Sequence, residues 1–296
     1  MTVVVGYAPH KGGRGALDLG LALAHARDEP MAVVTAVPRQ WTTPSLARID
    51  AEYAEYARQV GEYAEQQARG YLTDTSVDVP TAFRATTGRS VPSALIAAVK
   101  ELDAGMLVVG SSVESQVGRI VAGSTAEKLL HSCPVPLAIS PREYRSVAAA
   151  GFTRVTCAFS DSSATGMVGE AAALAARLGA DLRVASFGVR GATMYPPEVG
   201  LSAEDSVLDS WVKQAEAAQQ RLVAEGVVGP EVQCVVATGS GWGEALSAVE
   251  WRTGELLVLG SSPSGALARV FLGSRARKLI RYSPVPVIVL PGYPDV

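Results

Sequence analysis

Hydrophobic residues along this chain follow two alternating patterns: short unbroken apolar runs, and longer segments with apolar residues every three or four positions. Unbroken runs are typical of strands buried on both faces of a parallel sheet, and the spaced pattern is typical of helices that cover such a sheet. In the first half of the chain the runs predict strands at residues 3–6, 31–37, 78–84, 106–110 and 135–139. Helices are predicted from about residue 16, through a long segment that includes 46–63, and over 94–102.

The longest predicted helix of the first half has a single apolar seam. Its members are separated by steps of three and four: Leu46, Ile49, Tyr53, Tyr56, Val60 and Tyr63. Such steps place side chains on one face of a helix. We therefore predict that the tyrosines pack against the sheet and do not form a ligand cage.

The whole pattern starts again at residue 154. Strands are predicted at 154–159, at 182–187, at 232–237, in the run that ends at Gly260, and at 285–289. Helices are predicted over 170–178 and along a second apolar seam that consists of Leu208, Trp211, Ala215, Ala218 and Leu222. A Gly-Ser-Ser strand end and the Gly-Ser pair that follows it recur with an offset of 150 residues. The chain is thus a tandem duplication, and we place the domains at residues 1–143 and 152–296.

The duplicated motif is typical of a phosphate site. Gly110 and Gly260 each end an apolar run, and Gly123 and Gly273 each precede a predicted helix with a Ser cap. Helix-terminal amides at such a place point toward an anion. If the sheet is doubly wound, the first and fourth strands are neighbours and their carboxyl-terminal loops form one crevice.

Composition limits the kinds of binding partner and the cell compartment that we expect for this protein. A net charge of −3 gives no global attraction for nucleic acid or an acidic membrane. There is no apolar run of the roughly 18 residues that a spanning helix needs, and no secretion signature at the start, so we expect a cytoplasmic protein. Cys133, Cys157 and Cys234 fit neither a disulfide framework nor a metal cluster, and we predict that all three are small buried residues.

At this point the residues resemble a known family. Each half resembles a universal stress protein domain through Val-Gly in its first strand, the Gly-Ser-Ser strand end, the later Gly-Ser and the closing Ser/Cys-Pro-Val-Pro. Arg119 and Arg269, and Lys128 and Lys278, stand where the family often has basic residues. The resemblance implies an α/β fold of two doubly wound, parallel five-stranded sheets of order 3-2-1-4-5, which is Rossmann-like and similar to the adenine nucleotide α-hydrolases. It also implies an intramolecular pseudo-dimer through the fifth strands, with a homodimer as a further option.

The resemblance also implies adenine-nucleotide sites, but in a degenerate form. Family members that bind ATP carry Gly-x2-Gly-x9-Gly-Ser/Thr and an Asp at the end of the first strand. Here Val113 and Pro263 replace the middle glycine, Ala8 or Ser160 takes the place of the Asp, and Glu114 adds a negative charge. The second-half candidates are Ser160, Asp161, Gly260, Ser261, Ser262, Arg269, Gly273, Ser274 and Arg275, and the weaker first-half candidates are Gly110, Ser111, Ser112, Gly123, Ser124 and Thr125.

The sequence therefore favours a binding protein over an enzyme. It contains no legible Ser-His-Asp arrangement, metal cluster or Walker-type lysine motif. We expect a non-catalytic stress-response binding or sensor protein, with ATP or another adenine nucleotide as the expected ligand, no metal, and no nucleic-acid or membrane partner. Two alternatives stay open: a ligand-free structural interaction module, and a slow nucleotide hydrolase.

Overall fold

The computed structural model describes residues 1–9, 13–37, 47–75, 77–145, 148–160, 164–190, 197–263, 270–271 and 274–292. The first half contains β1 (Thr2–Gly6), α1 (Arg14–Ala26), β2 (Met31–Val37), α2 (Ala47–Thr73), β3 (Thr81–Thr87), α3 (Val91–Glu101), β4 (Ala104–Gly110), α4 (Ser124–Leu130) and β5 (Leu137–Ser140). A short 3-10 turn, η1 (Ala148–Ala150), lies on the connection to the second half.

The second half repeats this order. It contains β6 (Arg154–Ala158), α5 (Thr165–Leu178), β7 (Asp181–Val189), α6 (Pro197–Ala224), β8 (Gln233–Gly239), α7 (Trp242–Ser247), β9 (Glu255–Gly260), α8 (Ser274–Tyr282) and β12 (Val287–Leu290). A small antiparallel ribbon of β10 (Ser262–Pro263) and β11 (Val270–Phe271) lies between β9 and α8, and the sequence pattern did not predict it.

All the main strands join in one sheet. Its order is β3-β2-β1-β4-β5-β12-β9-β6-β7-β8, so each half has the predicted order 3-2-1-4-5. The fifth strands β5 and β12 pair antiparallel, with Val287 opposite Ile139, and this contact makes one ten-stranded sheet out of the two predicted sheets. The pairing covers two strand edges that would otherwise be exposed.

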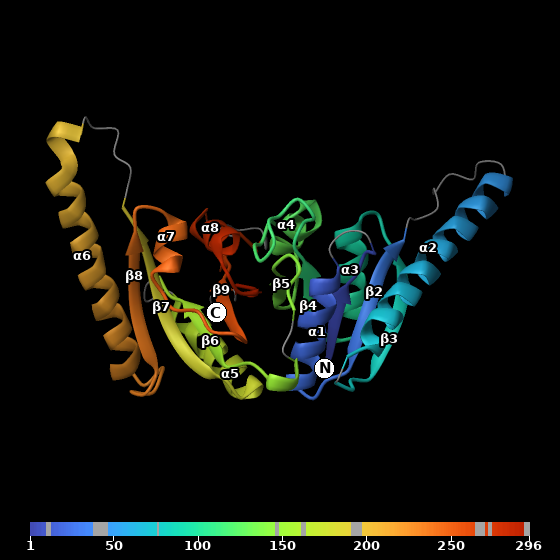
Figure 1. The fold of residues 1–296 in the computed structure, drawn as a ribbon, viewed down its shortest axis with the longest axis horizontal. Coiled ribbons are helices and arrows are strands. Elements are labelled where there is room, and N and C mark those ends of the chain that lie inside the picture. The colour runs from blue at the N-terminus through green and yellow to red at the C-terminus, as the bar shows by residue number, and fades with distance from the viewer. Residues whose placement is uncertain are drawn as a thin grey trace.

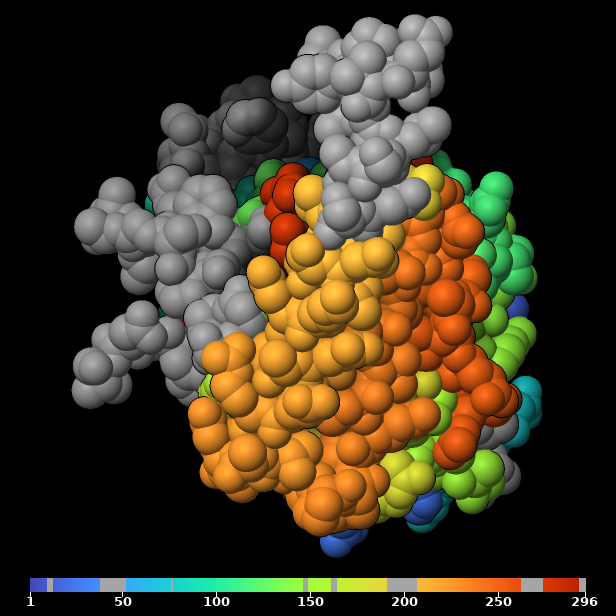
Figure 2. Space-filling model, turned by 90° about the vertical axis from the view of Figure 1, so that its left-hand side faces the viewer, coloured from blue at the N-terminus to red at the C-terminus, as the bar shows by residue number. Residues whose placement is uncertain are grey.

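Helices cover both faces of the sheet (Figure 1). The helices α1, α2, α5 and α6 pack on one face, and α3, α4, α7 and α8 pack on the other. Because both faces are covered, the central strands are almost entirely apolar and buried, as in Val3–Val5 of β1 and Val287–Leu290 of β12. Figure 2 shows one end of the sheet, where α6 and β8 form the outer surface of the second half.

The prediction for the face of α2 was wrong. Tyr56 and Tyr63 are 55% and 43% exposed, whereas Gly61, Ala64 and Ala68 are buried against the sheet. The buried seam is displaced around the helix and consists of small residues, because α2 packs very close to β3. A Cβ added to Gly61 would lie only 2.9 Å from the Cβ of Ala85.

Two smaller predictions also need correction. Helix α4 begins at Ser124 with Gly123 as its N-cap, and no side chain caps it, so Ser124 is not the predicted cap. Cys234 is exposed, because it lies on β8 at the edge of the sheet, while Cys133 and Cys157 are buried as predicted.

Candidate functional site

The strands β1 and β4 are neighbours, as the doubly wound topology predicts, and a groove opens where they end. Tyr7, Ala8 and Pro9 follow β1, Val113 follows β4, and all four line this groove, whose volume is about 960 Å³. The groove therefore lies at the position where open α/β sheets bind ligands.

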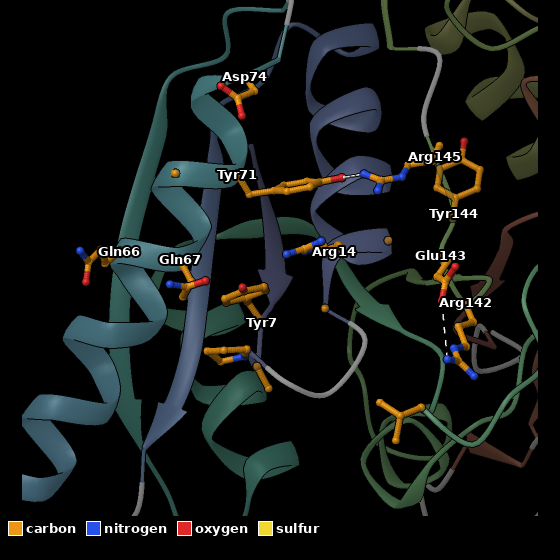
Figure 3. Close-up of a pocket in the computed structure, with 16 residues that line it drawn as sticks. Tyr7, Arg14, Gln66, Gln67, Tyr71, Asp74, Arg142, Glu143, Tyr144 and Arg145 are labelled. Atoms are coloured by element: carbon orange, nitrogen blue, oxygen red, sulfur yellow. Dashed lines mark hydrogen bonds and ion pairs between the residues drawn. The ribbon is translucent and has the colours of Figure 1, made fainter.

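Three further segments build the walls of the groove (Figure 3). The first turn of α1 contributes Arg14, the last turns of α2 contribute Gln66, Gln67, Tyr71 and Asp74, and the segment after β5 contributes residues 142–145. Three arginines, Arg14, Arg142 and Arg145, thus come from two distant parts of the chain to one cavity.

Tyr71 is the centre of the polar cluster in this groove. The guanidinium groups of Arg14 and Arg145 lie 5.6 and 5.7 Å from the centre of its ring. The Tyr71 hydroxyl donates a 2.7 Å hydrogen bond to Asp18 Oδ2 and accepts one from Arg145. Burial raises the pKa of Asp18, although the Tyr71 hydrogen bond and the Arg145 charge oppose that shift. Burial and the bond to Asp18 together raise the pKa of Tyr71 to about 12.

The three arginines differ in what they contact. Arg142 donates to the Ser115 carbonyl at 2.7 Å and pairs with Glu143 at 3.5 Å. Arg145 lies 3.8 Å from the Asp18 carboxylate. Within the part of the chain that the structure describes, Arg14 has no carboxylate partner; its guanidinium lies over the Tyr71 ring, and its charge also acts on Tyr7. Arg14 is therefore the cation that can meet an incoming anion without first breaking an ion pair.

The predicted first-half residues are not among those that line the groove; they lie at the end of β4, in the loop that follows it and at the start of α4. Ser111 Oγ accepts a hydrogen bond from the Val121 amide at 2.8 Å and donates to the Val121 carbonyl, so it closes the loop. Gly123 has an ordinary φ of −71°, and an added Cβ would come no closer than 3.6 Å to Ser112. Backbone geometry and packing therefore do not require glycine here, and its effect is to leave space between Ser112 and α4. The other candidates, Gly110, Ser124 and Thr125, border this space at the end of β4 and the start of α4.

The predicted second-half residues are only partly described. Ser160 lines a groove of about 710 Å³ beside α6, and Ser274 and Arg275 are exposed at the start of α8. Ser261 Oγ donates to the Leu290 carbonyl at 2.9 Å and accepts from the Gly292 amide, so it ties the end of β9 to the end of β12, unlike Ser111, which bonds within its own loop.

The remaining second-half candidates divide into two groups. Gly260 ends β9, and a Cβ there would lie 2.5 Å from Met167 Sδ, so packing alone favours glycine. Asp161, Arg269, Gly273 and the side chain of Ser262 lie outside the described residues.

Arg119 serves another purpose than phosphate binding in this structure. Its Nη1 donates a 2.9 Å hydrogen bond to the carbonyl of Tyr282, at the end of α8. The side chain therefore links the loop of the first half to the last helix of the second, and it satisfies a carbonyl that a helix end would leave unpaired.

Sequence reasoning missed the arginine-lined groove. The first helix was predicted from about residue 16, which left Arg14 in the preceding loop. Arg142 and Arg145 follow the last strand of the first half. The one local signal was the polar run at residues 141–145 directly after an apolar strand. Among the described residues there is no group of three His, Cys, Asp or Glu side chains that could hold a metal ion. A search of the described helices finds none that is long and apolar enough to cross a bilayer.

Fold and site together define a tandem, doubly wound α/β protein with a groove at the carboxyl ends of its first-half strands. Comparison with known sequences gives the family. Residues 1–141 and 151–291 each match the universal stress protein family, and the chain belongs to that family.

Similar proteins occur in mycobacteria. Universal stress proteins of Mycobacterium tuberculosis and Mycobacterium bovis are 46% identical over 293 residues, covering 99% of this chain and 100% of each relative. A universal stress protein of Mycolicibacterium smegmatis is 33% identical over 143 residues, or 48% of this chain and 99% of the relative. A universal stress protein from Archaeoglobus fulgidus shares the fold, with a TM-score of 0.62, 20% identity and 98% coverage of both chains.

Proposed function

We propose that this universal stress protein is a non-catalytic binding or sensor protein whose crevices take ATP or another adenine nucleotide. The observation that carries the proposal is the groove of about 960 Å³ at the ends of β1 and β4, with Arg14 at its wall. A cationic groove at the switch point of a doubly wound sheet suits a ligand that has a flat base and an anionic tail.

The binding site is reduced compared with the family pattern. Ala8 has no side-chain acceptor for the ribose, Val113 replaces a glycine, and the Ser111 hydroxyl is already bonded to Val121. What supports anion binding is the space at Gly123, the uncapped start of α4 and the charge of Arg14. The positive charge of Arg14 on α1 thus supplies part of the attraction for phosphate that the glycine loop supplies in the family's ATP-binding pattern.

The proposal assigns binding and not turnover. The chain contains no phosphate-loop lysine motif, and the residues known to line the groove offer no paired base and metal ligands in the pattern of phosphoryl-transfer sites. Slow hydrolysis and a ligand-free interaction module remain the alternatives, and each corresponds to a distinct result below.

The order in which the two halves fill also remains a prediction. The sequence expectation was that the second half binds first, because Glu114 repels phosphate in the first. The loop that decides this in the second half lies outside the described residues, whereas Arg14 gives the first half an attraction of its own. Gly123→Val and Gly273→Val separate the two sites.

The test is calorimetric titration of the full chain with ATP. Arg14→Gln should weaken binding by about tenfold or more, the effect of one charge-assisted hydrogen bond. Lys100→Gln is the matched control, because it removes one positive charge from the exposed last turn of α3, away from the groove. Equal weakening by both variants would contradict a role for Arg14.

Two other outcomes decide between the alternatives. Absence of heat at millimolar ATP in the wild type would favour the ligand-free module. Steady phosphate release that is lost in Gly123→Val or Gly273→Val would favour the hydrolase.

A further inference from the structure

A second cavity lies at the junction of the two halves, between α4 and α8, which face each other across the middle of the molecule (Figure 1). It is a groove of about 430 Å³. The first half contributes Ile120, Val121, Ala122, Glu127 and Leu130, and the second half contributes Arg277, Lys278, Ile280 and Arg281. Neither half alone forms this groove, so it is a product of the pairing between β5 and β12.

The floor of the groove is apolar. Ile120, Leu130 and Ile280 are buried in the core of this face of the sheet, and Val121 extends the apolar surface outward with 38% of its area exposed. Val117 and Tyr282, next to the groove in sequence, are 63% and 38% exposed. Apolar side chains gathered on a surface in this way are typical of an interaction site.

The rim of the groove is basic. Arg277 is partly neutralised, since it lies 3.8 Å from Glu127 and 2.7 Å from His131 Nε2. Lys278 and Arg281 have no carboxylate partner in the described parts of the chain, and their nearest recorded contacts are the rings of Trp242 and Tyr282, each at 5.9 Å. Two cations therefore stand over an apolar floor with their charge available.

The duplication shows that two of the three cations on this rim are particular to the second half, whereas Lys278 matches Lys128. Arg277 and Arg281 occupy the positions that Glu127 and His131 hold in the first half. The nine residues of α8 contain no acid and four cations, although the whole chain has a net charge of −3. A local basic surface on a protein of negative net charge attracts anions to this one place.

We propose that the groove between the two halves binds a free fatty acid, with its chain on the apolar floor and its carboxylate at Lys278 and Arg281. The volume lies within the usual range of roughly 300–1,000 Å³ for small-molecule sites, which are mostly apolar with a few placed charges. Both cations can lay their aliphatic stems along the chain while their charged ends reach the head group. This site shares no lining residue with the groove at β1 and β4.

The experiment is titration of the full chain with dodecanoate below its micelle concentration. Trp242 fluorescence is the local readout, because Lys278 lies over its ring. The variant Lys278→Gln/Arg281→Gln should bind about tenfold or more weakly. Arg275→Gln is the matched control, since Arg275 is an exposed cation of the same helix that does not line the groove. Val121→Asp, at an exposed position, should also weaken binding without disturbing the core.

Three outcomes would overturn the proposal. One is equal binding of dodecanoate by the wild type and the double variant. Another is equal binding of dodecyltrimethylammonium, which has the same chain and the opposite charge. The third is binding only to phosphatidylglycerol vesicles and not to monomeric dodecanoate, which would indicate a membrane surface instead. Arg14→Gln should leave dodecanoate binding unchanged, so failure of this site and failure of the nucleotide site are distinguishable.

Discussion

The two halves of the molecule share one fold but place their arginines in opposite ways. The first half directs Arg14, Arg142 and Arg145 into an open groove at the carboxyl ends of its strands. The second half buries Arg154 and Arg183 at the amino ends of β6 and β7. The comparison teaches that a duplicated α/β framework tolerates charge at either end of the sheet, provided that each charge is paired or solvated.

The buried cluster of the second half is centred on Glu255. Its carboxylate lies 2.7 Å from Arg154 Nη2 and 2.6 Å from Arg183 Nη2, and it accepts a hydrogen bond from Thr156. Both arginines also donate to the Glu250 carbonyl, at 2.8 and 3.0 Å. Burial lowers the pKa of Arg183 to about 10, although the Glu255 charge opposes that shift.

The first half has no counterpart to this cluster. Counted from the paired strands, the positions of Arg154, Thr156, Arg183 and Glu255 are taken by Thr2, Val4, Ala32 and Gly105. Helix α7 ends at Ser247, whereas the equivalent α3 continues to Glu101. Because α7 stops early, the Glu250 carbonyl is outside any helix and can accept from the arginines. Burying the charges therefore coincides with a shortened helix.

The converse difference explains the groove. Counted from the matching helix ends and strands, the positions of Arg14, Tyr71 and Arg142 are taken in the second half by Thr165, Leu222 and Gly292. Leu222 is buried, so the second half closes with an apolar contact where the first half has its Tyr71 cluster. The two halves thus offer different chemistry at equivalent places.

The largest effect should come from Glu255→Ala. This change leaves two buried arginines without their carboxylate, which typically costs about 3–5 kcal/mol in the free energy of unfolding. Denaturant unfolding of the full chain measures it, with the exposed Glu244→Ala as the control. A loss below about 1 kcal/mol would mean that Glu255 is not the centre of the cluster.

The same comparison can be sharpened by giving the second half the residues of the first. The combination Arg154→Thr, Thr156→Val, Arg183→Ala and Glu255→Gly should recover part of the stability that Glu255→Ala loses, since it leaves no buried arginine unpaired, and the cavity left by the smaller side chains limits the recovery. The Nε atom of Arg154 is buried without a partner, which adds to the cost of keeping the cluster. If the combined variant recovers none of the lost stability, the shortened α7 depends on these charges.

A smaller effect is expected at Asp18, in the first half. Because burial raises its pKa in the folded state, its contribution to stability is greatest below the unfolded pKa and is lost as the pH rises through the folded pKa. Asp18→Asn should therefore gain stability relative to wild type as the pH rises from about 4, the usual pKa of an unfolded Asp, through the raised pKa of the folded state. Unfolding measured as a function of pH tests the sign, and Glu170→Gln, at an exposed position in α5, should show no such trend.

The smallest effect concerns the reactivity of the cysteine thiols and leaves the free energy of unfolding unchanged. Cys133 and Cys157 are buried with pKa values raised to about 11 and about 12, whereas Cys234 is exposed on the edge strand. A disulfide reagent added to the native protein should modify Cys234 in a rapid phase and the other two only on unfolding, because Cys234 is accessible, although burial raises its pKa as well. Cys234→Ser should abolish the rapid phase.

The sequence predicted what depends on periodicity and repetition. The alternation of strands and helices, the duplication and the position of the crevice follow from apolar runs and from the duplicated Gly-Ser-Ser motif, whereas the strand order and the pairing of the fifth strands were implied by the resemblance to the family. The face of α2 was predicted wrongly because tyrosines spaced by three and four outweighed Gly61 and Ala64, and spacing alone cannot show which of two adjacent faces comes closest to the sheet.

The site could be predicted less well than the fold. Arg14, Tyr71 and Arg145 belong to three segments that only the tertiary structure brings together, and none of them forms a local motif. Arg119 illustrates the same limit, because the sequence showed only that it stands where the family often has a basic residue, while its partner is a carbonyl 163 residues away. A short motif reflects the backbone conformation of its own segment, whereas the partner of a long side chain depends on which distant segments the fold brings near it.

The antiparallel contact between β5 and β12 has a consequence for how such a protein can evolve. In a homodimer built through identical fifth strands, every substitution appears in both subunits, so a change that helps one site must be tolerated at the other. Here both partners of the contact belong to one polypeptide, and each substitution appears once. Because the two halves are joined in one chain, each half can change without the other. Equivalent positions can then carry opposite charges that meet across the contact, as Glu127 and Arg277 do.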